Sequence, residues 1–183
     1  LLALGVSPES IRNGLASLEG VPGRLERVPN ELDINVLIDY AHTADAMRLV
    51  LASLRELTKG RLIVVFGCGG NRDQTKRPVM GKMASLLADY VVLTSDNPRS
   101  EDPRAIIAQI QSGFPPGFQQ CEIVPDREQA IVAALSLARR EDTVLIAGKG
   151  HEAQQIFDHI SIPFSDREVV ERWVGTRHSL ALT

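Results

Sequence analysis

Short runs of β-branched and apolar residues alternate along this chain with longer stretches that repeat apolar residues at helical spacing. Four strong runs occupy residues 36–41, 62–68, 90–95 and 143–147, and a weaker one lies at 122–124. Nearly continuous hydrophobicity is typical of strands that are covered on both faces. The alternation therefore predicts βαβ units, and with them an α/β fold built on a doubly wound, mostly parallel sheet.

The stretches between the runs are the expected helices. Residues 47–54 and 130–137 carry apolar side chains at the i, i+3, i+4, i+7 spacing of one helical face. Residues 77–88 and 103–110 are expected to be helical as well. Near the end of the chain, residues 159–164 are expected to add a strand, with an antiparallel orientation as one possibility, before a last helix at 166–174.

The first residues do not continue this alternation. Ser7 and Pro8 resemble a helix start, because proline is favoured in the first turn, and a short apolar stripe follows before glycines at 20 and 23 break it. We interpret residues 1–23 as the helical tail of a preceding domain and residues 24–183 as one doubly wound domain. The chain does not begin with Met, which favours a piece of a longer protein.

Composition excludes several classes of function. The formal net charge is −3 and no dense basic block occurs, so neither nucleic acid nor an anionic membrane is expected as a partner. No apolar run approaches the roughly 20 residues of a membrane span. The two cysteines form neither a disulfide framework nor a metal-ligand spacing, which favours a reducing cytoplasm.

Polar and glycine-rich clusters follow each of the four strong runs. They occupy residues 39–42, 67–73, 96–99 and 148–152. In an open parallel sheet, ligands bind outside the carboxyl ends of the strands, where all four clusters should meet on one rim. The sequence therefore predicts that this rim binds a charged small molecule.

The cluster at residues 67–73 combines closely spaced glycines with Arg72. Glycine lets backbone N–H groups approach a ligand, and a guanidinium suits phosphate or carboxylate. The basic residues Lys76 and Arg77 downstream favour the same interpretation. The spacing matches neither the dinucleotide nor the phosphate-loop fingerprint. The alternative is a glycine-rich turn that leaves Arg72 in solvent.

The cluster at residues 96–99 reads Asp-Asn-Pro-Arg and predicts a stiff turn. Pro98 restricts its own φ and pushes Asn97 toward extended backbone. Arg99 could bind a carboxylate through a bidentate fork, while Asp96 could orient the turn or attract an ammonium. The alternative is an Asx-type turn that merely leads into the next helix, a common arrangement for such residues.

The remaining two clusters are ambiguous in the same way. Gly148 and Gly150 allow close approach and Glu152 could bind an amine, whereas a lysine or histidine in such a loop is more commonly solvated. His42 lies just before a helix, where an anion is favoured. A cysteine nucleophile at Cys68 is a weaker alternative, because no base stands at a known spacing from it.

In this order, the clusters resemble those of the C-terminal domain of the Mur ligases. The resemblance covers nearly the whole chain with its spacing intact, and it is carried by residues 21–26, 39–43, 66–73, 76–78, 96–99, 148–152 and 165–167. Within the family, the Asp-Asn-Pro-Arg tetrapeptide is similar to the recognition motif of the members that add meso-diaminopimelate. Lysine-adding members carry a different sequence there.

The resemblance implies a Rossmann-like domain with two kinds of site. A meso-diaminopimelate site would use Arg72, Asp96, Asn97, Pro98, Arg99, Gly148 and Glu152. An ATP site would lie near His42, Asn71 and Arg72. In the meso-diaminopimelate site, Arg99 would pair with the carboxylate at the end of the ligand that does not react. Glu152 would attract the ammonium at that same end.

The resemblance also implies a reaction of peptidoglycan synthesis. An ATP-dependent ligase would activate UDP-N-acetylmuramoyl-L-alanyl-D-glutamate as an acyl phosphate, which the amine of meso-diaminopimelate would attack. The family's phosphate loop, Mg²⁺ ligands and UDP-binding domain do not occur in these 183 residues. We therefore expect no catalytic or metal-binding residue in this chain, no ligation by the chain alone, and a monomer.

Two other interpretations stay open at this point. The same pocket would serve a stand-alone module that binds an amino acid or nucleotide without chemistry. A related ligase, lysine-adding or polyglutamate-forming, would also fit the fold, although residues 96–99 argue against it.

Overall fold

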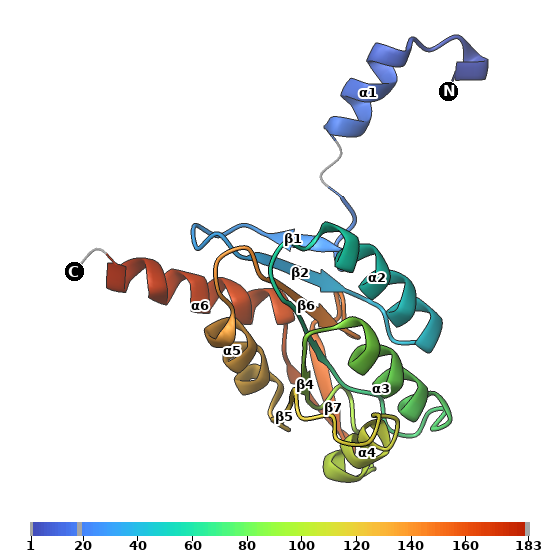
Figure 1. Cartoon of the computed structure of the whole chain (residues 1–183), viewed down its shortest axis with the longest axis vertical. Coiled ribbons are helices and arrows are strands. Elements are labelled where there is room, and N and C mark those ends of the chain that lie inside the picture. The colour runs from blue at the N-terminus through green and yellow to red at the C-terminus, as the bar shows by residue number, and fades with distance from the viewer. Residues whose placement is uncertain (1, 18–19, 182–183) are drawn as a thin grey trace.

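The computed structural model describes residues 2–17 and 20–181, and these form a six-stranded sheet with helices on both faces (Figure 1). The strand order is β1-β2-β6-β3-β4-β5. Strand β1 runs antiparallel to β2, and the other four pairings are parallel, which confirms the doubly wound, mostly parallel sheet. The strands are β1 (Glu26–Val28), β2 (Asn35–Asp39), β3 (Leu62–Phe66), β4 (Tyr90–Leu93), β5 (Cys121–Ile123) and β6 (Thr143–Ala147).

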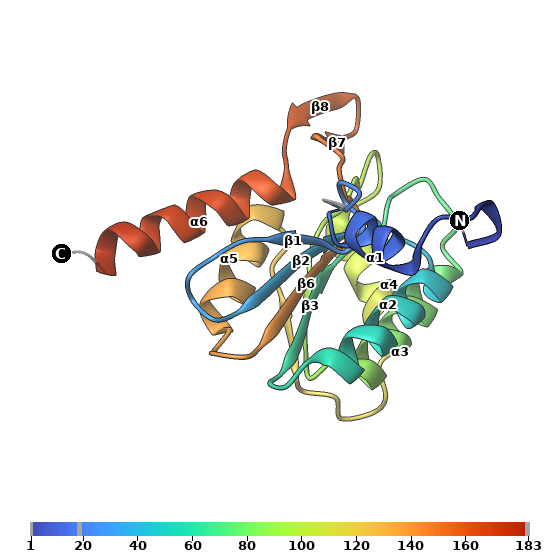
Figure 2. The same ribbon diagram turned by 90° about the horizontal axis from the view of Figure 1, so that it is seen from above.

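Helices cover the two faces unequally, as Figure 2 shows with the strands lying between the two groups of helices. Three helices pack on one face and two on the other. The first group is α2 (Ala44–Leu57), α3 (Lys76–Leu87) and α4 (Pro103–Gln111), and the second is α5 (Arg127–Leu137) and α6 (Asp166–Ala181). The helices expected around residues 47–54, 77–88, 103–110 and 130–137 are therefore all present.

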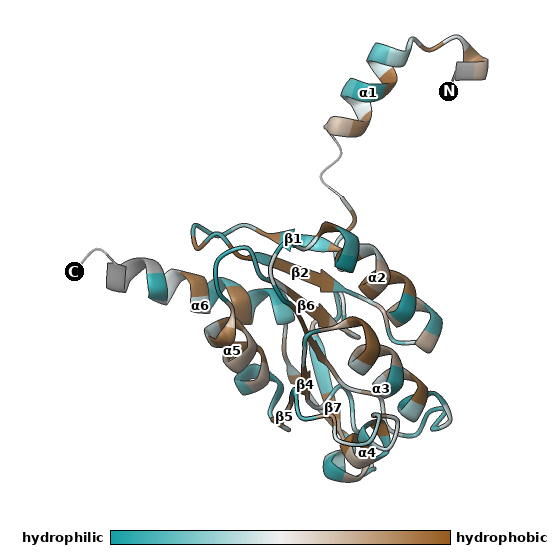
Figure 3. Ribbon diagram, viewed as in Figure 1, coloured by the Kyte–Doolittle hydropathy of each residue, from teal (hydrophilic) through white to brown (hydrophobic). Residues whose placement is uncertain are grey.

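Each central strand contributes to two separate cores. All five residues of β3 are buried, with Val64 and Phe66 facing one set of helices and Ile63 and Val65 facing the other. Successive side chains of a strand point to opposite faces, so a strand that is covered twice must be apolar throughout. Figure 3 shows this as apolar colour along the inner strands.

Three elements depart from the expectations. The antiparallel edge strand β1 was not predicted. The strand expected at residues 159–164 is present as β8 (Ile160–Pro163), but it pairs with the unpredicted β7 (Gln154–Phe157) in a separate two-stranded sheet. The last helix continues to Ala181 rather than ending at residue 174. All three are short or polar, so hydrophobic periodicity carries little signal for them.

The N-terminal helix α1 (Pro8–Ala16) stands apart from the sheet in Figure 1. Ser7 caps it by accepting a hydrogen bond from Ser10 N, as the sequence suggested. None of the nine residues of α1, all of them described, is buried. Across the described ranges, no helix is long and apolar enough to cross a membrane.

A buried ion pair joins the two helices of the second face to the sheet. Arg127 opens α5 and donates to Asp166, which opens α6, at 2.7 and 2.8 Å, and neither side chain is exposed (0%). The same guanidinium donates to the carbonyls of Ala147, at the end of β6, and Ser95, beyond β4. This arginine thereby fixes both helix starts against the carboxyl end of the sheet.

We predict that Asp166→Asn lowers the free energy of unfolding by about 3–5 kcal/mol, because it leaves the Arg127 charge buried without its counterion. The matched control is Glu128→Gln, which breaks an exposed pair between the same helices, Arg172 to Glu128 at 2.8 Å. That change should cost at most about 1 kcal/mol. Urea unfolding at pH 7 compares the two, and similar losses would contradict the role given to Arg127.

Candidate functional site

The four polar clusters meet on one rim of the sheet, as the sequence predicted. The strand order places the ends of β2, β6, β3 and β4 side by side. Direct backbone hydrogen bonds then join the loops: Gly148 N donates to Asp39 O at 3.0 Å, and Gly70 N donates to Asn97 O at 2.9 Å. The rim is therefore one continuous structure rather than four separate turns.

The glycines of the 67–73 loop serve loop packing. A Cβ on Gly67 would lie 2.1 Å from Thr94 O, and one on Gly70 would lie 1.8 Å from Pro98 O. Side chains at either position would separate the two loops. The N–H of Gly70 already donates to Asn97 O, so the expected role of presenting N–H groups to a ligand is wrong for this glycine.

Arg77 links the 67–73 loop to the segment that follows the 96–99 loop. Its side chain is fully buried and forms a bidentate pair with Glu101, at 2.8 and 3.0 Å. It also donates to Gly69 O, while Glu101 accepts from the N–H of Asn71. The suggestion that Arg77 helps to bind a ligand is therefore wrong, because its guanidinium is used inside the protein.

Two other guanidinium groups on these loops, those of Arg72 and Arg99, are at least partly exposed. Arg99 has a φ of +51° and donates through Nη1 to Gly70 O at 2.8 Å, while Nη2 has no hydrogen-bond partner among the described residues. Arg72 is exposed and likewise has no partner in the described ranges. Asn71 holds the loop through Oδ1, which accepts from Ser100 N and Oγ. The outer edge of the rim therefore carries cationic charge that no carboxylate of the described residues neutralises.

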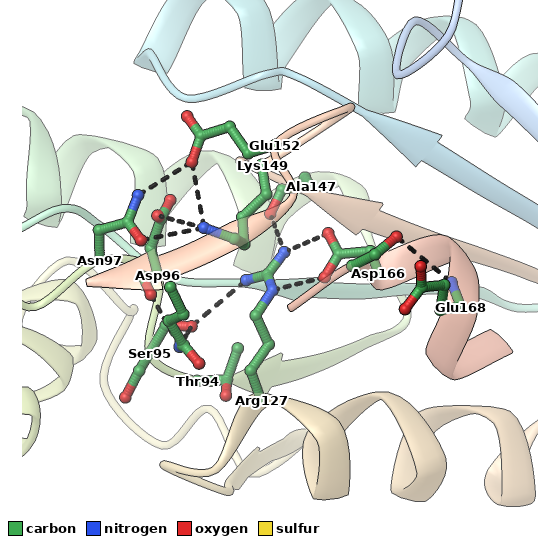
Figure 4. A network of polar contacts seen from close by, with 12 residues as sticks. Thr94, Ser95, Asp96, Asn97, Arg127, Ala147, Lys149, Glu152, Asp166 and Glu168 are labelled. Carbon is green, nitrogen blue, oxygen red and sulfur yellow. Dashed lines mark hydrogen bonds and ion pairs between the residues drawn. The ribbon is translucent and has the colours of Figure 1, made fainter. Parts of the chain in front are cut away.

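The inner part of the rim is acidic and contains a buried lysine (Figure 4). Lys149 Nζ lies 3.0 Å from Asn97 Oδ1, 3.1 Å from Glu152 Oε2 and 3.8 Å from Asp96 Oδ1. Its side chain is 0% exposed. The expectation of a solvated lysine in this loop is therefore wrong for Lys149, although it holds for the exposed neighbour His151.

The β7–β8 hairpin forms hydrogen bonds with the 96–99 loop. Ile156 N donates to Asn97 Oδ1 at 3.0 Å, and Gln155 Nε2 donates to Asp96 O at 2.8 Å. Asn97 also donates through Nδ2 to Glu152 Oε2 at 2.9 Å. The side chain of Asn97 thus bonds to three parts of the protein and orients the loop that carries Arg99.

The two carboxyl groups of the inner rim have opposite pKa shifts. Burial alone would raise the pKa of Glu152, but hydrogen bonds from Asn97 and Lys149 and the Lys149 charge lower it below the usual range. Burial raises the pKa of Asp96 and outweighs the nearby charges of Arg127 and Lys149. The surroundings of Glu152 therefore favour its ionised form, whereas burial of Asp96 favours the protonated form.

The loop that follows β6 requires glycine on both sides of Lys149. Gly148 has a φ of +112°, and a Cβ there would lie 2.9 Å from Asp96 Oδ2. Gly150 has a φ of +54°, and a Cβ there would lie 2.9 Å from both Gly23 O and Tyr40 Cβ. The backbone around Lys149 is consequently held in a conformation that other residues rarely adopt.

The β2 end forms a second, exposed part of the rim. The His42 ring lies at the start of α2, with Nδ1 2.8 Å from Tyr40 O and its centroid 4.6 Å from that of the Tyr40 ring. Lys76 Nζ donates to His42 O at 2.6 Å, which adds a cation to this edge. Asp39 accepts from the N–H groups of Ala41 and Leu25, so its carboxylate stabilises the turn.

The remaining candidates do not form a reactive or metal site. Cys68 is buried against Met80, with the sulfur atoms 3.7 Å apart, and burial raises the pKa of its thiol to about 12. In the part of the chain that the structure describes, no group of three or more His, Cys, Asp or Glu side chains could hold a metal ion.

Residues 23–150 match the family described as Mur ligase, glutamate ligase domain. A UDP-N-acetylmuramoyl-L-alanyl-D-glutamate–2,6-diaminopimelate ligase from Gloeobacter violaceus is 50% identical over 97% of this chain and 36% of its own length. A protein of the same name from Syntrophomonas wolfei is 51% identical over 90% of this chain and 34% of its own length. The chain therefore spans about a third of the length of the curated relatives it matches.

A solved structure with the same enzyme name superimposes closely on this chain. The TM-score is 0.82 at 36% sequence identity, and the match covers 96% of this chain and 36% of the other. The similarity thus includes the β7–β8 hairpin and α6 as well as the residues of the family match.

We predict that neither cysteine is labelled quickly by a thiol reagent in the folded chain at pH 8. Burial raises the pKa of Cys68 to about 12 and that of Cys121 to about 11, so the reactive thiolate of Cys68 is on the order of a thousandfold scarcer than in a free cysteine. Labelling with a chromogenic disulfide, with and without urea, measures this. Rapid labelling of Cys68 without urea would revive the cysteine-nucleophile interpretation.

We predict that Glu101→Gln destabilises the chain by about 2 kcal/mol at pH 7, because Arg77 loses its buried counterion. The hydrogen bond from Arg77 and that from Asn71 lower the pKa of Glu101. The stabilisation is therefore fully present above the unfolded pKa of about 4 and is lost as the pH falls through the lower folded value.

Urea unfolding at several pH values between 7 and 2 tests this dependence. The difference between Glu101→Gln and the wild-type chain should shrink toward the acid end. The control Glu56→Gln removes the same charge from the exposed surface of α2 and should change stability little at any pH. A pH-independent difference for Glu101→Gln would mean that the ion pair is not its cause.

Proposed function

The chain belongs to the Mur ligase family, and on that premise we propose that it is the amino-acid-binding domain of an ATP-dependent ligase that adds meso-diaminopimelate to UDP-N-acetylmuramoyl-L-alanyl-D-glutamate. One structural observation carries the proposal. The rim of the sheet carries the acidic side chains of Asp96 and Glu152 (Figure 4). It also carries the guanidinium groups of Arg72 and Arg99, which have no carboxylate partner among the described residues. The names of relatives at 50% and 51% identity support the same reaction.

The amino-acid site would bind the end of the ligand that does not react. Arg99 would donate to the remote carboxylate through its free Nη2, with Arg72 beside it. The remote ammonium would bind to Glu152, whose Oε1 has no hydrogen-bond partner among the described residues. The wall of the amino-acid site, and with it the shape of the site, would be formed by Asp96, Asn97, Pro98 and Gly148. This arrangement would leave the other amine pointing away from the sheet, toward the activated acceptor.

ATP would bind beside this site, at the edge formed by His42, Asn71 and Arg72. The residues present fit a nucleotide in part. The His42 ring and Arg72 are exposed and free to contact phosphate, and Lys76 adds charge to the same edge. Asn71 would act by holding the loop, since its Oδ1 is already bonded to Ser100. When bound, ATP supplies the phosphoryl group that activates the acceptor carboxylate for amide formation.

Magnesium does not fit the described part of the chain, and we assign no step through it to these residues. Its ligands and the phosphate loop would come from a preceding domain of a longer ligase. Residues 1–23 would be the end of that domain. Leu4 and Leu15 are 80% and 61% exposed, as expected of apolar side chains that a neighbouring domain would cover.

We predict that meso-diaminopimelate shifts the amide NMR signals of residues 96, 97, 99 and 148–152, whereas L-lysine does so only at much higher concentration, because lysine lacks the second carboxylate. Arg99→Asn should weaken binding at least about tenfold, the loss expected for one charge-assisted hydrogen bond. Asparagine is chosen because it tolerates the positive φ at this position.

The control for this titration is Arg104→Asn, which removes an exposed guanidinium from α4 and should leave binding unchanged. Equal binding of both amino acids would overturn the assignment of Arg99. Binding of neither would count against an amino-acid site formed by this chain.

A further inference from the structure

Lys149 carries its ammonium in a cage of oxygen acceptors that the chain itself provides. Asp96, Asn97 and Glu152 surround Nζ at 3.8, 3.0 and 3.1 Å. The side chain cannot easily turn away, because the glycines on either side hold the backbone at positive φ and are packed against other loops. The cage is therefore filled by an internal cation before any ligand arrives.

The internal ammonium limits what a ligand can reach. It contacts only Oε2 of Glu152, and Asn97 donates to that same oxygen. The other oxygen, Oε1, has no dashed contact in Figure 4 and points away from the lysine. A ligand ammonium can consequently pair with Glu152 through Oε1, the oxygen that Lys149 and Asn97 leave unoccupied.

The internal ammonium also sets the charge of the site. Arg127 and Asp166 neutralise each other nearby. Lys149 offsets one of the two remaining carboxylates, Asp96 and Glu152, while Arg72 and Arg99 have no carboxylate partner within the described ranges. A ligand end that bears both an ammonium and a carboxylate matches this distribution. A bare amine would match it only if the lysine charge were absent.

We propose that Lys149 is a specificity-determining positioning residue, whose ammonium fills the cage of Asp96, Asn97 and Glu152 and so selects ligands with a zwitterionic end over simple amines. The selectivity rests on the proposed function, whereas the filling of the cage does not. A lysine with only a structural role would stabilise the fold without affecting the choice between ligands, and this difference can be measured.

The first measurement needs no ligand. In the wild-type chain, the Lys149 ammonium should give a slowly exchanging ¹⁵Nζ–H signal at pH 7, because it is buried and bonded, whereas exposed lysines exchange too fast to be seen. In Lys149→Met, the carboxyl carbon of Glu152 should titrate at a higher pH than in the wild type, since the cation and one hydrogen bond are lost. The control Lys82→Met removes the same charge from the exposed surface of α3 and should leave that titration unchanged.

Chemical rescue separates the ammonium from general damage to the fold. Lys149→Ala removes three carbons and the ammonium, which are the atoms of n-propylammonium. Adding that cation to Lys149→Ala should return the Glu152 titration toward the wild-type value, and 1-propanol, of the same shape without charge, should not. Rescue by both or by neither would overturn the proposal that the cage binds an ammonium.

The second measurement tests selectivity. The ratio of the Kd values for L-lysine and meso-diaminopimelate should fall by about tenfold in Lys149→Met, the equivalent of one charge-assisted contact, and stay constant in Lys82→Met. A shifted Glu152 titration with an unchanged ratio would overturn the specificity role. If the wild-type chain binds neither ligand, the proposed function fails and the selectivity with it, while the ligand-free titration still decides whether Lys149 fills the cage.

Discussion

Three basic side chains, Arg77, Arg127 and Lys149, are completely buried near the carboxyl end of the sheet, and the rest of the rim depends on how they are paired. A buried charge is costly unless an anion and hydrogen bonds compensate it. Arg77 pairs with Glu101, Arg127 with Asp166, and Lys149 with Glu152. The first two pairs join segments that lie on different loops or helices. The third lies within one loop, and Asn97, which bonds to both Lys149 and Glu152, joins it to the loop at residues 96–99. The neutralisation of charge and the positioning of the loops are therefore one constraint.

This constraint explains why the candidate site is held by contacts that the chain itself provides. The loop at residues 96–99 is held by the glycine loop on one side and by the β7–β8 hairpin on the other. Its backbone and the side chain of Asn97 are occupied by internal contacts. In the part of the chain that the structure describes, the groups without an internal hydrogen-bond partner include Oε1 of Glu152, Nη2 of Arg99 and the guanidinium group of Arg72. A preformed site of this kind loses little conformational entropy when a ligand binds.

The support of the site extends beyond the residues that match the family. The match ends at residue 150, yet Gln155, Ile156 and Asp166 bond to the loops of the rim or to the arginine beneath them. The hairpin and α6 are therefore part of the structure that holds the site. The superposition on a solved relative, which covers 96% of the chain, includes these elements.

The sequence by itself determined the α/β architecture and the location of the rim. Runs such as 62–66 and 143–147 are apolar throughout because both faces of their strands are covered, and this pattern can be read locally. It could not tell that Lys149 is buried or that Arg77 faces inward, since their partners lie up to 53 residues away in the chain, as for Lys149 and Asp96. Only the tertiary structure, by inserting β6 between β2 and β3, decided which charges meet, because pairing depends on distance in space and local periodicity reports only burial.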